Sequence, residues 1–206
     1  MYLFLPDMDK VFDRFFFPWY PEDEKKSFRK IKVKPDVQSW AEPETELSSI
    51  QFLKEEGIKK VDEMIQKMIY AASEDWKTYL GVDGEPDIDW VDKFDRYYDK
   101  KQVLLLLNKS KADNFTNDFI VTCCEFGAVL GKVLIDLNSG VGWLYDYPYW
   151  ESSIYDPKTG SLINIFHWAI KKFSNYGIED GYKPKLLACS QFIQKGGFKK
   201  KNLNSD

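Results

Sequence analysis

The sequence predicts an α+β protein in which a mainly helical N-terminal two-thirds packs on a small antiparallel sheet of about three or four strands, followed by C-terminal helices. Apolar residues recur at intervals of three and four before the sheet region, as they do in amphipathic helices. Aromatic residues then occupy every second position over 143–149, as one face of a strand requires. The chain has 206 residues, of which 44% are hydrophobic, and this is enough for a single domain over residues 1–206.

Residues 1–40 are predicted to form an aromatic-rich N-terminal extension that packs on the body of the domain. Its clustered aromatic side chains would form a large apolar patch in solvent, and such patches are rare on monomeric proteins. We expect a short helix over about 7–17, ended by a proline, and a strand over the alternating residues 28–33. At the other end of the chain, residues 198–206 are expected to form a frayed basic tail.

Further helices are expected in the middle of the chain. Residues 48–51 have the spacing of a capping box, and the helix or pair of helices behind them extends to Leu80, with Gly57 as a bend or break. Asp87 can cap the next helix. The apolar run 103–107 is too short for its periodicity to separate a buried strand from a helix, and we favour a helix.

Asn114 or Thr116 can cap the following helix, which runs to about Leu137 and has interior glycines at Gly127 and Gly131. An interior glycine costs a helix roughly 1 kcal/mol relative to alanine, so two of them require a compensating contact. We therefore predict that a neighbouring helix or sheet packs directly against the backbone at these glycines.

After this helix we expect a small sheet and two final helices. The alternating aromatic residues predict a strand over 143–149, and strong turn residues follow at 156–160. A second strand is expected over 162–166. The final helices are expected over about 168–175 and 183–194, each stopped by glycine.

The motif Phe126-Gly-Ala-Val-Leu-Gly131, the following Trp143 and the Lys171-Lys172 segment resemble uncharacterised bacterial families known only as domains of unknown function. In these families a helix with a Gly-x-x-x-Gly step leads into a tryptophan-containing strand, and a later strand ends near a basic residue. The resemblance covers about residues 74–177. It implies an α+β fold and carries over no catalytic residue.

Charge and composition argue against several classes of function. The net charge of −4 does not favour nucleic acid as a partner, because phosphate binding needs a concentrated basic face. No apolar stretch approaches the roughly 20 residues that cross a bilayer, so we expect no membrane association. The three cysteines do not form a disulfide framework, and together with the absence of a signal-peptide core they predict a cytoplasmic protein.

The sequence predicts no catalytic residue, no metal site and no cofactor. His167 is the only histidine, and no nucleophile motif accompanies it, so a structural role is favoured. Cys123 and Cys124 lie in an apolar segment and are expected to be buried. The acidic residues over 83–89 do not form a calcium loop, because the sixth position is Ile88 rather than glycine.

The leading hypothesis is a non-enzymatic protein that acts by binding another protein, of which a toxin-neutralising immunity protein is the most concrete version. A small, acidic, aromatic-rich domain without a catalytic constellation favours this class. The alternative is a small-molecule or carbohydrate binder, or an enzyme, that uses His167 with Asp146 or Glu151 beside the hairpin. The sequence leaves the oligomeric state open. The candidate binding residues are Tyr145, Asp146, Tyr147, Trp150 and His167.

Overall fold

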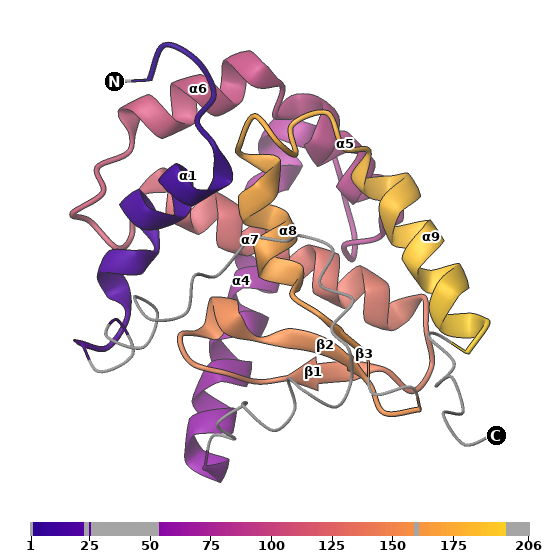
Figure 1. Cartoon of the computed structure of the whole chain (residues 1–206). Helices are drawn as coiled ribbons and strands as arrows, with labels where there is room; N and C mark the ends of the chain where they lie inside the picture. The colour runs from indigo at the N-terminus through magenta and orange to yellow at the C-terminus, as the bar shows by residue number, and fades with distance from the viewer. Residues whose placement is uncertain (1, 23–24, 26–53, 159–160, 197–206) are drawn as a thin grey trace, which may run out of the picture.

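The structure is a computed structural model that describes residues 2–22, 25, 54–158 and 161–196 (Figure 1). Some of the predicted elements lie outside the described residues, namely the strand over 28–33, the capping box at 48–51, the tail at 198–206 and much of the second half of the 1–40 extension.

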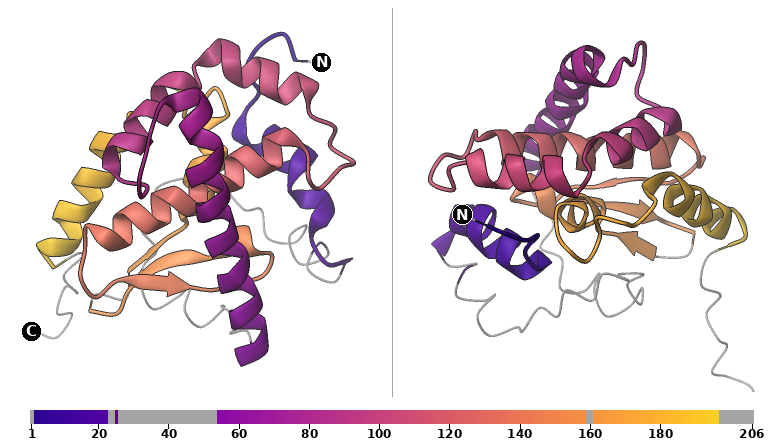
Figure 2. Two further views of the ribbon diagram at one scale, coloured as in Figure 1. Left: turned by 180° about the vertical axis from the view of Figure 1, so that it is seen from behind. Right: turned by 90° about the horizontal axis from the view of Figure 1, so that it is seen from above.

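Seven α-helices and one three-stranded antiparallel sheet make up the described part of the chain, so the predicted α+β fold is confirmed. The helices are α1 (Met8–Phe15), α4 (Glu55–Leu80), α5 (Ile88–Tyr97), α6 (Lys100–Lys109), α7 (Asp118–Asp136), α8 (Ile165–Lys172) and α9 (Tyr182–Gln194), with short 3-10 helices η1 (Phe17–Trp19) and η2 (Tyr149–Glu151). Helix α7 is central and packs mainly against α4 and α8, and Figure 2 shows α4 crossing α7 on the side seen from behind.

The sheet is a meander of β1 (Gly142–Leu144), β2 (Ser153–Asp156) and β3 (Ser161–Ile163), in that order. Trp143 pairs with Ile154, which pairs in turn with Ile163. Ile154 and Ile163 are buried, and β2 contacts both α7 and α8. One face of the sheet therefore closes the core beneath these two helices (Figure 1).

Helix α7 is buried on nearly all sides, and the side chain of Asn117 caps its N-terminus. The Asn117 Oδ1 atom accepts hydrogen bonds from the backbone N–H groups of Phe119 and Ile120, both at 3.0 Å. The prediction of Asn114 or Thr116 as the cap was wrong. Asn114 Oδ1 instead accepts from the N–H and the hydroxyl of Thr116 and so forms the turn in front of the helix.

The predicted strand over 143–149 was too long, because β1 ends at Leu144. Pro148 lacks an N–H for a sheet ladder, and the chain turns there into η2. The strand predicted over 162–166 is likewise shorter, since α8 already begins at Ile165 and places His167 on a helix. The helix predicted over 103–107 is confirmed as part of α6.

The N-terminal helix α1 packs on the body of the domain through its apolar face. Phe15 and Phe16 are fully buried, and their ring centroids lie 4.6 and 6.0 Å from that of Phe119 in α7. Helix α4 is continuous from Glu55, so Gly57 lies in its first turn and does not divide it.

The two interior glycines of α7 lie against aromatic rings. A Cβ atom added to Gly127 would lie 2.4 Å from Cδ1 of Phe166, and one added to Gly131 would lie 2.1 Å from Cη2 of Trp143. Phe166 belongs to α8 and Trp143 to β1. The prediction that a neighbouring helix or sheet packs directly against this backbone is confirmed, and the contacts are made by ring atoms.

Replacing Gly131 by alanine is expected to destabilise the protein. Overpacking a core costs about 1–3 kcal/mol, and the better helix propensity of alanine offsets about 1 kcal/mol, so we expect a net loss of up to about 2 kcal/mol in urea unfolding. Gly142→Ala is the matched control, because nothing lies within 4 Å of its added Cβ. Equal stability of the two variants would contradict the packing argument.

Candidate functional site

The structure divides the five predicted binding residues between the surface and the core. Trp150 is only 2% exposed and belongs to the core, whereas Tyr147 is 53% exposed. Tyr145, Asp146 and His167 are half-buried. The hydroxyl of Tyr145 donates a 2.7 Å hydrogen bond to Oδ1 of Asp62 in α4. An open cleft lined by Trp150 is therefore not formed.

The turn between β1 and η2 is fixed by hydrogen bonds around Asp146. The Asp146 N–H donates to Oγ of Ser152 at 3.0 Å, and Oδ1 of Asp146 accepts from the N–H of Tyr147 at 2.7 Å. Burial raises the pKa of the Asp146 carboxyl, the Tyr147 amide lowers it and the charge of Glu151 raises it, with a net upward direction. These contacts hold the backbone that presents the Tyr147 ring.

A polar network connects Trp150 to His167 beneath this turn. The indole N–H of Trp150 donates to the hydroxyl oxygen of Tyr20 at 3.0 Å, and the Tyr20 hydroxyl donates to Oε1 of Glu151. Nε2 of His167 lies 3.3 Å from the same carboxylate oxygen. Of the two acids that the sequence offered as partners of His167, the structure therefore pairs it with Glu151.

The His167 and Glu151 side chains are 23% and 21% exposed, so solvent reaches the edge of the pair. Burial lowers the pKa of His167, but the charge and hydrogen bond of Glu151 raise it, and the net direction is upward from 6.5. With Nε2 assigned as the donor, Nδ1 is an acceptor for which the described residues supply no hydrogen-bond partner. The pair has the arrangement of a base supported by a carboxylate.

The single histidine makes this pair directly measurable by NMR. We expect the ring protons of His167 to titrate above pH 6.5, and Glu151→Gln to lower that midpoint because burial then acts without the opposing charge. The raised pKa of His167 makes a contribution to stability that is complete at pH values below the pKa of this histidine in the unfolded chain. This contribution is lost as the pH rises through the pKa of His167 in the folded protein. A wild-type midpoint at or below 6.5 would show that burial outweighs the effect of Glu151 on the pKa of His167, and would contradict the upward direction.

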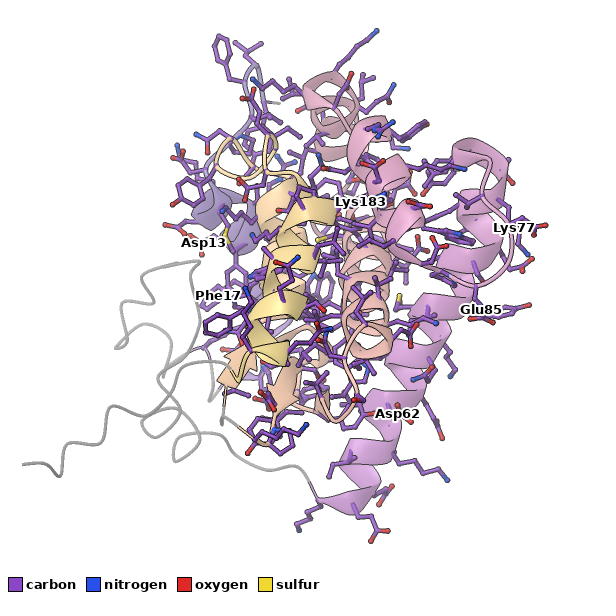
Figure 3. All side chains as sticks on the ribbon, turned by 90° about the vertical axis from the view of Figure 1, so that its right-hand side faces the viewer. Asp13, Phe17, Asp62, Lys77, Glu85 and Lys183 are labelled. Carbon is purple, nitrogen blue, oxygen red and sulfur yellow. The ribbon has the colours of Figure 1, made fainter. Side chains whose placement is uncertain are left out.

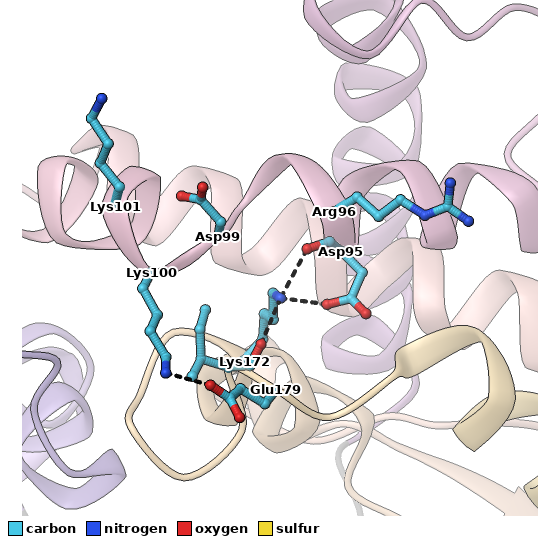
Figure 4. A pocket seen from close by; sticks show the side chains of 8 residues that line it. Asp95, Arg96, Asp99, Lys100, Lys101, Lys172 and Glu179 are labelled. Carbon is cyan, nitrogen blue, oxygen red and sulfur yellow. Dashed lines mark hydrogen bonds and ion pairs between the residues drawn. The ribbon is translucent and has the colours of Figure 1, made fainter.

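A pocket of about 480 Å³ opens between the end of α5, the start of α6 and the turn after α8 (Figure 4). Lys172 forms its inner side and is 1% exposed. Its Nζ donates to the backbone oxygens of Asp95 and Ile178, at 3.0 and 3.2 Å, and pairs with the Asp95 carboxylate. Nearer the surface, Lys100 pairs with Glu179. The Lys172 ammonium is therefore fully paired by the Asp95 carboxylate and the two backbone oxygens within the protein.

Glu125 is a buried acid that the sequence analysis did not single out. It is 2% exposed on α7, and its Oε2 accepts a 3.1 Å hydrogen bond from the indole N–H of Trp76, while Oε1 has no partner among the described residues. The pKa of Glu125 is raised to about 7: burial is the largest cause, the Trp76 hydrogen bond opposes it, and nearby Asp75 adds to it. Glu125 is the one charged residue between Phe119 and Gly131, and this was the signal that could have found it.

The described residues contain neither a helix that could span a membrane nor a cluster that could hold a metal ion. None of the helices there is long and apolar enough to cross a membrane. The same part of the chain contains no group of three or more His, Cys, Asp or Glu side chains that could hold a metal ion. Comparison of the chain with protein-family models, with curated proteins and with solved structures found no match.

Proposed function

We propose that this chain is a non-enzymatic cytoplasmic protein that binds another protein through the Tyr147 surface, which consists of Tyr145, Asp146, Tyr147 and Asp62. A toxin-neutralising immunity protein is the most concrete version of this function. The three cysteines are free and buried, which fits a reducing compartment.

The observation that carries the proposal is the exposed ring of Tyr147 on a fixed backbone. A tyrosine offers a large contact area, and its hydroxyl can form a hydrogen bond at an interface. Because the Asp146 side chain and Ser152 already hold the turn, little backbone entropy remains to be lost on binding. A preorganised, half-exposed tyrosine is the kind of residue that dominates binding energy.

The charge of this surface indicates the kind of partner. Asp62 and Asp146 accept hydrogen bonds, but neither forms an ion pair with a described residue. Lysine or arginine side chains on a partner would complement these carboxylates and would speed association at low salt. We therefore propose a basic protein surface as the occupant.

Affinity capture with the full chain from a lysate of the source organism tests the proposal. A stoichiometric basic partner that is retained by wild type and Tyr70→Ala but lost with Tyr147→Ala supports it. Tyr70 is a matched control because its ring is also exposed, at 68%, but lies on the outer side of α4. The immunity version further requires that the partner stops growth when expressed alone and that co-expression of this chain restores growth. Capture of no stoichiometric partner would count against the function.

The pair of His167 and Glu151 supports a second candidate, a small-molecule or acid–base site. The observation in its favour is the unpartnered Nδ1 at the edge of a half-buried pair. A ligand bound there would shift the His167 ring resonances of the wild type and would no longer bind His167→Gln. A screen of metabolite and sugar mixtures that leaves these resonances unchanged would end this candidate.

A further inference from the structure

A cluster of two lysines and one aspartate lies between α8 and α9, away from the Tyr147 surface. Oδ2 of Asp180 is 2.8 Å from Nζ of Lys171 and 3.5 Å from Nζ of Lys185. The Lys171 side chain is 11% exposed and that of Lys185 is 24% exposed. The Asp180 carboxylate is therefore shared by two largely buried ammonium groups, and it lies closer to that of Lys171.

The Lys185 amine also lies against aromatic rings. Its Nζ is 4.2 Å from the centroid of the Trp168 ring and 5.2 Å from that of Tyr182. Both aromatic residues are buried, so the rings remove water from one side of the amine, while the Lys185 side chain keeps 24% of its exposure. The amine is accessible to a small reagent but is poorly solvated as a cation.

The position of Lys185 in its helix also disfavours the charged form. Lys185 is the fourth residue of α9, and the first turn of this helix contains no acidic residue. A helix N-terminus carries partial positive charge, and helical side chains tilt toward it. The ammonium group is thus held near the positive end of the helix as well as near Lys171.

Together these effects increase the fraction of Lys185 that carries a neutral amine. The pKa of Lys185 is lowered to about 8: burial is the largest cause, the charge of Lys171 acts in the same direction, and Asp180 opposes both. The attraction between the ammonium and the two rings acts in the opposite direction and favours the charged form. Lys183 lies on the same helix (Figure 3). It pairs with Asp89 at 2.6 Å, and that contact raises its pKa.

We propose that Lys185 is a nucleophilic amine that binds small aldehydes or ketones covalently as a Schiff base. The lone pair of neutral Nζ attacks the carbonyl carbon and forms a C–N bond. The nitrogen loses its two protons, the carbonyl oxygen leaves as water, and no oxidant or reductant is needed. Asp180 is placed to accept and return a proton during the loss of water, because its Oδ2 is 3.5 Å from Nζ.

Reductive trapping on the intact chain tests this assignment. The protein is incubated at pH 7.5 with limiting glyoxylate and cyanoborohydride, and the labelled lysines are quantified by peptide mass spectrometry. We expect Lys185 to be labelled at least about 10-fold faster than Lys183, with a rate that rises to a plateau near pH 8–9. Lys171→Gln should slow the labelling of Lys185, because it removes the neighbouring positive charge.

Two outcomes would overturn the proposal. One is equal labelling of Lys185 and Lys183 in protein shown by circular dichroism to be folded. The other is a Lys185 rate that still rises with pH up to 10.5, the ordinary value for a lysine. Formaldehyde in place of glyoxylate separates amine reactivity from anion binding, since it carries no charge. Preferential labelling of Lys185 by both reagents supports its assignment as a nucleophilic amine. Loss of this preference with formaldehyde would contradict the assignment.

Discussion

Lys172→Met is expected to lower the free energy of unfolding by about 3–5 kcal/mol, as breaking a buried ion pair does. The methionine fills the space of the lysine stem but leaves the Asp95 carboxylate without its cation. It also removes the donor for the backbone oxygens of Asp95 and Ile178. The loss should appear in urea unfolding as a lower midpoint with an unchanged slope.

Lys100→Met is the matched control, because it breaks an ion pair at the rim of the same pocket (Figure 4). The Lys100 and Glu179 side chains are 62% and 76% exposed, and such pairs add little to stability. Similar losses for the two variants would show that burial does not distinguish the two pairs and would contradict the account of Lys172.

Glu125→Gln is expected to stabilise the protein at pH 8 by on the order of 2–3 kcal/mol. The folded state holds the Glu125 proton up to a pKa of about 7, whereas the ordinary value is 4.5. Between these two values the folded state binds more protons than the unfolded state, so stability falls as pH rises from 4.5 toward 7. A glutamine is neutral at every pH and keeps an oxygen for the Trp76 indole.

Urea unfolding at pH 5, 6, 7 and 8 measures this effect. The difference in stability between wild type and Glu125→Gln should grow through this range and level off above pH 7. Glu63→Gln on the exposed face of α4 is the control for the change of chemistry alone. A constant difference across the four pH values would contradict a buried, protonated Glu125.

Local sequence signals predicted much of the fold. Asp87 caps α5 through hydrogen bonds from the N–H groups of Asp89 and Trp90, as its position before an apolar face indicates. The glycines of α7 correctly indicated close packing, because only a tight contact offsets their poor helix propensity. Pro148 was the overlooked signal, since a residue without an N–H interrupts the strand pattern that the aromatic residues predicted.

The site was harder to predict, because its contacts join distant parts of the chain. Tyr20 reaches Glu151 across 131 residues, and no local pattern specifies that pairing. The aromatic alternation also gave the wrong orientations, since the turn after Leu144 leaves Tyr147 exposed and buries Tyr149. Similarly, a charged run such as Lys171-Lys172 gives no sign that one lysine is fully buried.

The most direct test of the proposed function is the affinity of the captured partner for matched tyrosine variants, measured by isothermal titration calorimetry. If Tyr147 dominates the interface, Tyr147→Ala should weaken binding by at least about 30-fold, which corresponds to about 2 kcal/mol. Tyr70→Ala should bind like the wild type. Equal affinity of Tyr147→Ala and wild type, with both proteins folded, would contradict the assignment of binding to the Tyr147 surface.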